Sequence, residues 1–173
     1  MAVEIGWNGT SSGWLGFDAD ERLCRSITAA TGIPATTSVL ALNEMLAAKG
    51  ARDFALVTPY LENVQQRIIE NYSRSGFRCV AERHLGLQVN FSFAEVPEGE
   101  IRRMAREVAA AQPQSIATFC TNLRAAHLAA GLEDELGIPV YDTISTVVWK
   151  CLRVAGVDTS RVLGWGSLFS EGF

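Results

Sequence analysis

Three short segments of this chain carry residues that could bind an acid and move a proton. Each follows a predicted strand and precedes a predicted helix, and a helix start offers unpaired N–H groups and the positive end of its dipole. Such loops bind a carboxylate or a developing oxyanion, and hydroxyl groups add further donors. The three segments are Asn8-Gly9-Thr10-Ser11-Ser12-Gly13, Thr58-Pro59-Tyr60 and Phe119-Cys120-Thr121-Asn122.

Cys120 is the candidate for chemistry at a carbon atom. A thiol in front of a helix has its thiolate favoured, which suits proton transfer or nucleophilic attack. Cysteine is also one of the most buried residue types, but Cys120 stands at the end of a strand and not within an apolar face. The other three cysteines, Cys24, Cys79 and Cys151, fall inside a predicted helix, strand and helix, and we expect them to be structural.

For several other polar and aromatic residues, the sequence allows either a role at the site or a purely structural role. Asp142 follows the last predicted strand, where it could border the site or cap the next helix. Trp14 and Phe17 could line an apolar substrate pocket or simply pack in the core. His84 and His127 have no patterned carboxylate partner, which favours a surface or core role over that of a base.

Composition excludes several function classes for the 173-residue chain. The net charge of −4, without a block of Lys or Arg, argues against a nucleic-acid surface. The apolar stretches are too short for a membrane span, and the first residues lack the pattern of a secretory signal. We therefore expect a cytoplasmic protein with free thiols that acts on a small molecule. Four cysteines without a CxxC pair and only two histidines predict no metal site.

Short apolar strands alternate with helices along the whole chain. This pattern predicts an α/β protein with parallel sheets flanked by helices, in which a ligand lies at the carboxyl ends of the strands. The loops after Trp7, Val57 and Phe119 emerge at that edge. Strands are expected at residues 3–7, 54–58, 77–85, 115–119 and 138–141, and helices at 19–31, 37–48, 61–72, 98–111, 123–136 and 145–155.

The same segments resemble the aspartate/glutamate/hydantoin racemase superfamily, in the branch that holds maleate cis-trans isomerases and arylmalonate decarboxylases. The first active-site loop of that branch reads Cys-Thr-Ser in isomerases and racemases and Gly-Thr-Ser in the decarboxylase; this chain has the latter. The matching segments are residues 7–16 (WNGTSSGWLG), 57–64 (VTPYLENV) and 116–123 (IATFCTNL), and then the strand and helix from 136–140 (LGIPV) through Trp149 and Gly156.

The resemblance implies an enzyme without a cofactor that acts at the carbon next to a carboxylate. Cys120 would be its acid, and the groups that bind the substrate or oxyanion would be Gly9, Thr10, Ser11, Tyr60, Thr121 and Asn122. Because Gly9 replaces the first-loop cysteine, decarboxylation of a malonate-type acid with protonation by Cys120 is expected first. A maleate isomerase, an Asp/Glu-type racemase and a catalytically silent binding protein stay open as alternatives.

The resemblance also implies flavodoxin-like, pseudo-symmetric lobes, the first of which is incomplete. We expect residues 1–50 to form this first lobe, 51–147 to form the second lobe with the Cys120 loop, and 148–173 to return to the first lobe. Family members begin with a further strand and a Pro/Ser/Asn loop upstream of Val3. The chain is therefore expected to be either a fragment or a short homologue that completes its lobe by association as a homo-oligomer.

Overall fold

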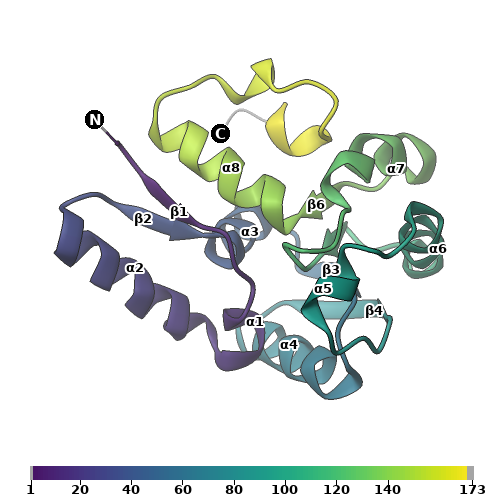
Figure 1. The fold of residues 1–173 in the computed structure, drawn as a ribbon. Helices are drawn as coiled ribbons and strands as arrows, with labels where there is room; N and C mark the ends of the chain where they lie inside the picture. Colours follow the sequence, from purple (N-terminus) through teal and green to yellow (C-terminus); the bar gives the residue numbers. More distant parts are fainter. Residues whose placement is uncertain (1, 171–173) are drawn as a thin grey trace.

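The computed structural model describes residues 2–170, which form an α/β fold with two parallel sheets (Figure 1). The larger sheet has the strand order β4-β3-β5-β6, and the smaller one pairs β1 with β2. This arrangement confirms the predicted fold class. The strands are β1 (Ile5–Trp7), β2 (Ala35–Thr37), β3 (Asp53–Thr58), β4 (Arg78–His84), β5 (Ser115–Thr118) and β6 (Val140–Asp142).

Helices cover both faces of the larger sheet, and α2, α3 and α8 pack against the smaller one (Figure 1). The helices are α1 (Ser12–Leu15), α2 (Phe17–Thr31), α3 (Ser38–Ala48), α4 (Glu62–Arg74), α5 (Asn90–Phe93), α6 (Glu98–Ala109), α7 (Ala129–Leu136) and α8 (Thr143–Val154), with short 3-10 turns at Ala126–Leu128, Thr159–Arg161 and Ser167–Phe169. None of the helices within residues 2–170 is long and apolar enough to cross a membrane.

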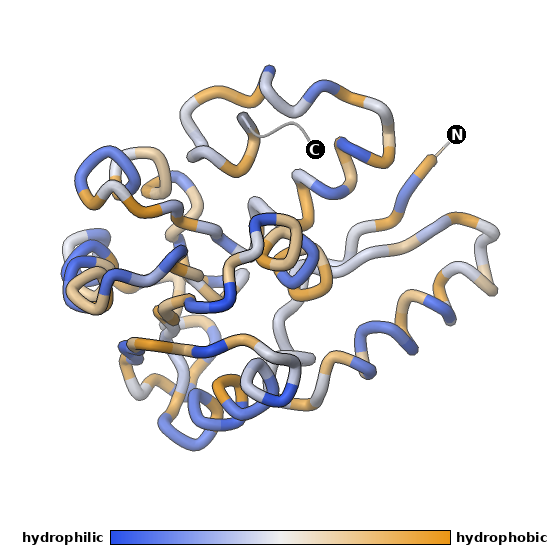
Figure 2. The backbone as a smooth tube through the Cα atoms, turned by 180° about the vertical axis from the view of Figure 1, so that it is seen from behind, coloured by the Kyte–Doolittle hydropathy of each residue, from blue (hydrophilic) through white to orange (hydrophobic). Residues whose placement is uncertain are grey.

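The central strands β3 and β5 form the middle of the core. Every residue of β5 is buried, as is β3 apart from its first residue, because helices cover the sheet on both faces. Apolar residues gather along these inner segments, whereas the helices around them carry hydrophilic residues on their outer turns (Figure 2). This rigid centre holds the loops that follow β3 and β5.

The structure differs from the predicted elements at four places, one of which, the short helix α5, is described with the site below. The strand β2 was missed because it has only three residues, and its last one, Thr37, is also the cap of α3, with Oγ1 accepting from the N–H of Leu40 at 3.1 Å. The segment after Gly9 contains the short helix α1. The helix predicted from Leu123 was wrong at its start, since tight turns carry the chain to the 3-10 turn before α7.

The last long helix links the two sheets. The helix α8 starts at Thr143, directly after β6, and packs against α3 and β1 (Figure 1). The chain thus returns from the larger sheet to the smaller one. The division into segments 1–50, 51–147 and 148–173 remains a prediction.

Candidate active site

A cavity of about 480 Å³ opens where the loops after β1, β3 and β5 meet. This is the carboxyl edge of the strands, as expected for a parallel sheet. The lining residues come from these loops and from the segment before and within α5: Trp7, Gly9, Thr10, Ser11, Trp14, Tyr60, Leu61, Val64, Leu87, Gln88, Asn90, Phe93, Cys120 and Thr121. Six of the seven residues that the sequence suggested for the site therefore lie around one cavity.

Asn122 is the exception among those residues. Asn122 is not among the lining residues, and its Nδ2 donates to the carbonyl of Asn90 at 2.6 Å. Because Asn90 lines the cavity, this bond fixes the loop after β5 to the opposite wall. Asn122 thus holds the walls together through its side chain.

The Cys120 thiol lies on the cavity wall with only 3% of the residue exposed. Burial raises its pKa above the ordinary value, although the Tyr60 hydroxyl and the N–H groups of Asn122 and Leu123 donate to the sulfur and lower it in part. The expected preference for the thiolate was therefore wrong. The regular helix after this loop begins only at Ala129, so Cys120 does not lie in its first turn, and desolvation has the largest effect on the pKa of the thiol.

A hydrogen-bonded chain links the first loop to the thiol. Thr10 Oγ1 and the Tyr60 hydroxyl are 2.8 Å apart, and the Tyr60 hydroxyl bonds to Cys120. Burial, then the neighbouring Cys120, raises the pKa of Tyr60 far above its ordinary value, so this side chain acts as a donor. The Tyr60 ring is held edge-on by Trp14 and Phe93, with ring centroids 5.2 and 5.6 Å away.

Two buried aspartates accept hydrogen bonds from hydroxyl groups at or next to the loops of the site. Asp20 accepts from the hydroxyls of Ser12 and Thr37 at 2.7 and 2.5 Å, which fixes the first loop to the start of α3. On the other side, Thr118 donates to Asp142 at 2.7 Å. Asp142 also caps α8, so capping was the correct interpretation of this residue. Burial raises the pKa of Asp142 to about 6.

The cavity wall has no Lys, Arg, His, Asp or Glu side chain among its lining residues. An anionic substrate would have to be bound by neutral donors, which here are hydroxyls and backbone N–H groups. The remaining wall is apolar and is formed by Trp14, Leu61, Val64, Leu87 and Phe93. Within residues 2–170, no group of three or more His, Cys, Asp or Glu side chains is placed to hold a metal ion.

Comparison with known proteins decides the family. The family model described as arylmalonate decarboxylase matches residues 2–169. This chain belongs to the arylmalonate decarboxylase and maleate isomerase family. The family is part of the Asp/Glu racemase superfamily, and its characterised relatives include decarboxylases and isomerases.

The similarity extends over nearly the whole chain but not over the whole of its relatives. The chain is 28% identical to arylmalonate decarboxylase of Bordetella bronchiseptica, and the match covers 98% of this chain and 72% of that relative. It is 23% identical to maleate isomerase of Geobacillus stearothermophilus, with 88% of this chain and 62% of that relative covered. A crystal structure of arylmalonate decarboxylase superposes with a TM-score of 0.86 at 26% identity, covering 98% of this chain and 76% of that one.

Gly9 lines the cavity in the first loop and brings no side chain to it. A Cβ atom built there would lie 2.6 Å from Nε1 of Trp7, so the indole fills the space next to the glycine. Trp7 is half-exposed at the rim of the cavity. Cys120 is the only thiol among the lining residues.

The wall around α5 is the part that sequence reasoning missed. Gly86 and Leu87 donate to the carbonyls of Tyr60 and Pro59 at 3.0 and 2.9 Å, which brings this segment over the cavity. Alternating apolar residues from Leu85 to Phe93 were the available signal. Trp14 and Phe17 could each have lined a pocket or packed in the core. Trp14 lines the cavity, whereas Phe17 packs on Tyr72 in the core with ring centroids 5.0 Å apart.

Neither histidine lies at the cavity. His84 bonds to Glu82 and Glu62 at 2.9 and 3.0 Å, and His127 bonds to Glu98 at 2.9 Å. Both histidines therefore sit in contacts with glutamates, and neither is among the residues that line the cavity. The interpretation of these residues as general bases has no support in the geometry.

Proposed function

We propose that this chain is a cofactor-independent decarboxylase of malonate-type acids, in which Cys120 protonates the intermediate. The observation that carries the proposal is a single buried thiol on the wall of a cavity that has no second acid or base of suitable pKa. Because burial raises the pKa of Cys120, the thiol keeps its proton at neutral pH. A protonated thiol suits an acid and does not suit a nucleophile.

Neutral donors would hold the carboxylate that remains on the product. The hydroxyls of Thr10, Ser11 and Thr121 border the cavity together with the N–H groups of the two loops. Donors fixed in this way stabilise an oxyanion without reorganising during the reaction. The second carboxylate would face the apolar wall, where loss of charge as carbon dioxide is favoured over a desolvated anion.

The proton step follows from the contacts of Cys120. Cleavage of the carbon–carbon bond releases carbon dioxide and leaves its electron pair in an enediolate. The thiol then gives its proton to the α-carbon, and the resulting thiolate accepts hydrogen bonds from Tyr60 and from the N–H groups of Asn122 and Leu123. Water restores the thiol proton. With a thiol on one side only, the product forms in one configuration.

The relatives supply the alternative. Maleate isomerases are in the same family, and the fold alone does not separate the two reactions. A two-thiol mechanism needs a second cysteine at the first loop, where this chain has Gly9. The single-thiol reaction therefore fits this chain better.

A direct assay separates the candidates. The purified chain is incubated with an α-methyl-α-arylmalonate and, separately, with maleate, and we measure carbon dioxide release, fumarate formation and the enantiomeric excess of the product. We expect carbon dioxide release with one product enantiomer in excess and no fumarate. Fumarate formation would support the isomerase, and binding of the malonate without turnover would support a silent binding protein.

A further inference from the structure

The helix α4 carries a polar residue, Gln65, in its fully buried stripe. The other members of this stripe are Ile68 and Tyr72, and none of the three has exposed surface. A buried amide costs free energy unless its donor and its acceptor are both bonded. A leucine would pack at this position without that cost, so packing alone does not explain Gln65.

Both ends of the Gln65 amide are bonded to side chains of the larger sheet. Its Nε2 donates to Oε2 of Glu82 on β4 at 2.8 Å, and its Oε1 accepts from the hydroxyl of Thr58, the last residue of β3, at 2.7 Å. A carboxylate only accepts hydrogen bonds, so Glu82 fixes the orientation of the amide and makes Thr58 a donor. The Thr58 oxygen in turn accepts from the N–H of Tyr60 at 3.3 Å.

His84 holds the outer end of this series of bonds. The same Glu82 oxygen bonds to Nδ1 of His84 at 2.9 Å, and Nε2 of His84 bonds to Glu62, the first residue of α4, at 3.0 Å. Thr58 and Gln65 have no exposed surface, and the His84 side chain is 20% exposed. Because water does not reach the inner bonds, they order the groups that they join.

The loop that receives these bonds places the Tyr60 hydroxyl. The backbone of Tyr60 is held at its N–H by Thr58 and at its carbonyl by the N–H of Gly86 at 3.0 Å. At the far end of the ring, the hydroxyl donates to Cys120. A small rotation of the backbone displaces that hydroxyl, and hydrogen bonds weaken steeply as their geometry becomes poor.

We propose that Gln65 is a positioning residue, which fixes Tyr60 through Thr58 and thereby sets the hydrogen bond to the Cys120 thiol. Glu82 gives the series its direction, and His84 fixes Glu82. Gln65 is not among the residues that line the cavity, so it acts on the site only through the loop. The consequence for turnover rests on the proposed function, whereas the consequence for the thiol does not.

The rate of Cys120 alkylation tests the proposal without an assay of turnover. Gln65→Leu keeps a side chain of similar size but removes both bonds of the amide, so Thr58 no longer holds the Tyr60 loop. At a given pH below the midpoint of the profile, alkylation of Cys120 should slow by about 3- to 10-fold, since a hydrogen bond to an ion is weakened and not removed.

Gln66→Leu is the matched control on the same helix. Gln66 is exposed, and its amide donates to Oε1 of Glu62 at 2.8 Å, outside the series that reaches Thr58. This variant should leave Cys120 alkylation unchanged. An equal loss of rate in Gln66→Leu and Gln65→Leu would overturn the proposal.

A double-mutant cycle separates positioning from a general loosening of the fold. In a chain that already carries Tyr60→Phe, Gln65→Leu should cause no further change in Cys120 alkylation, because the hydroxyl that it positions is gone. A loss of rate that persists in full beside Tyr60→Phe would show that Gln65 acts on the thiol by another route and would overturn the proposal.

Glu82 provides a second pair of variants. Glu82→Leu should slow Cys120 alkylation as Gln65→Leu does, and Glu82→Gln, which keeps an acceptor oxygen, should retain the rate of the unaltered chain. The Glu82 side chain is 30% exposed, so this pair decides the question if Gln65→Leu does not fold.

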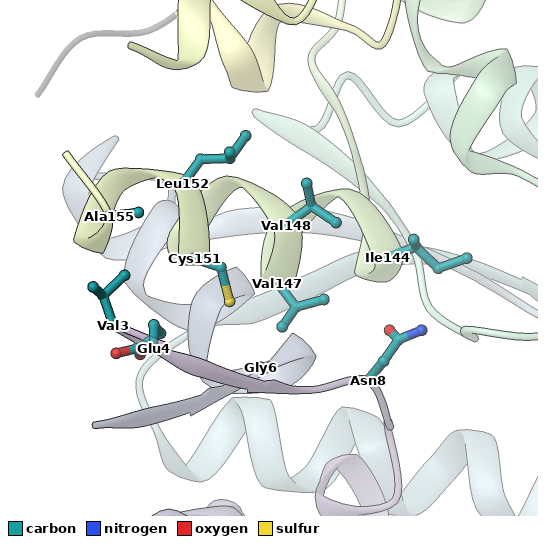
Figure 3. Close-up of a pocket in the computed structure, with 10 residues that line it drawn as sticks. All are labelled: Val3, Glu4, Gly6, Asn8, Ile144, Val147, Val148, Cys151, Leu152 and Ala155. Carbon is teal, nitrogen blue, oxygen red and sulfur yellow. The ribbon is translucent and has the colours of Figure 1, made fainter. Parts of the chain in front are cut away.

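Cys151 is the internal reference in the same samples. It projects from α8 toward β1 and lines a different cavity (Figure 3). Cys79 is unsuitable here, because burial and then the nearby Glu82 raise the pKa of its thiol. An unchanged rate of Cys120 alkylation in both Gln65→Leu and Glu82→Leu would overturn the proposal. The expected loss of rate in a chain that releases no carbon dioxide would support the positioning role and contradict only the proposed function.

Discussion

At Cys120, desolvation and hydrogen bonding act in opposite directions on the thiol. Burial favours S–H, while three donors around the sulfur favour the thiolate, and burial has the larger effect. This balance suits an acid that keeps its proton until a carbanion-like carbon is close. After the transfer, the same donors stabilise the thiolate. Tyr60 is the donor whose side chain can be changed without moving the backbone.

Tyr60→Phe should raise the pKa of Cys120 further, because the hydroxyl bond that lowers it is lost. A hydrogen bond to an ion contributes about 1.5–3 kcal/mol, so we expect kcat to fall by roughly 10- to 100-fold. The pH dependence of Cys120 alkylation, followed by site-resolved mass spectrometry, measures the shift. An alkylation profile unchanged in the variant would show that the Tyr60 bond has no effect on the thiol. Cys79, whose pKa burial raises to about 12, serves as the internal control.

Gly9→Cys should raise racemisation of the chiral acid and lower decarboxylation. The new thiol provides a second acid/base on the first loop and takes up space beside the reacting carbon. The side chain displaces the Trp7 indole, which is half-exposed and therefore able to rotate. Enantiomeric excess and deuterium uptake from solvent are the measurements.

Gly9→Ala is the matched control for this change. It adds the same Cβ atom without the thiol, so it should lower decarboxylation and leave the configuration of an isolated acid unchanged. Equal racemisation by the alanine and cysteine variants would contradict the role of a second thiol. Rapid racemisation by the unaltered chain would favour the racemase alternative.

At the scale of elements, strands and longer helices could be predicted from the sequence, and so could the meeting of three loops. The runs 54–58 and 115–119 are short, mostly apolar and followed by turn-forming residues, which is the pattern of a buried strand. The missed elements are short: β2, α1 and α5 have three or four residues each, and tertiary contacts with Asp20, Asn71 and the Tyr60 loop hold them. No local pattern indicates such contacts.

The charge state of Cys120 could not be predicted for a related reason. The sequence places the thiol between a strand and a helix, and the inference of a helix dipole assumed that the helix starts at once. Leu123 is fully buried and Ala125 is 1% exposed, and the chain makes tight turns to bury them before α7 begins. Burial of the loop, which depends on the whole fold, decides the pKa of the thiol.

Asp142→Asn tests how the cap of α8 is stabilised. The pKa of Asp142 in the folded state is about 6, above the ordinary value of 3.8. Between these two pH values the folded state therefore binds more protons than the unfolded state. The carboxylate therefore costs stability as pH rises from about 4 through about 6. Relative to the unaltered chain, the asparagine variant should gain about 1–3 kcal/mol in free energy of unfolding between pH 4 and pH 7.

Urea unfolding at several pH values measures this difference. Asp158→Asn is the control, because hydrogen bonds from Ser160 lower the pKa of the exposed Asp158, the opposite direction to Asp142. Its difference from the unaltered chain should not grow between pH 4 and pH 7. A constant difference for Asp142→Asn over the same range would contradict the assigned shift.

At the scale of the whole molecule, the cavity exists because α1 and the loop after β1 pack against α4 and meet the loops of the larger sheet. The first loop reaches Cys120 through α1, which contacts α4 and the side chain of Phe119. A Cβ atom at Gly13 would lie 2.7 Å from Phe119, which is fully buried. This close approach sets the distance between the two halves of the site.

Gly13→Ala should therefore lower the free energy of unfolding by about 1–3 kcal/mol, since the buried ring has no space to move into. It should also lower activity, because α1 shifts the first loop away from Cys120. Gly131→Ala is the matched control in α7, where the new Cβ atom meets only the end of the Arg102 side chain at 3.6 Å. The control should leave stability unchanged or raise it by up to about 1 kcal/mol. Equal effects of the two substitutions would contradict the packing argument.

The central claim, that Cys120 is the acid of the reaction, is tested most directly by the rate of carbon dioxide release and product protonation in Cys120→Ala. We expect the rate to fall by about 10²- to 10⁴-fold, the usual contribution of a positioned proton donor, with an unchanged circular dichroism spectrum. Cys151→Ala, which removes a thiol outside the active-site cavity, should retain the rate. A Cys120→Ala variant that releases carbon dioxide as fast as the unaltered chain, with the same enantiomeric excess, would contradict the account.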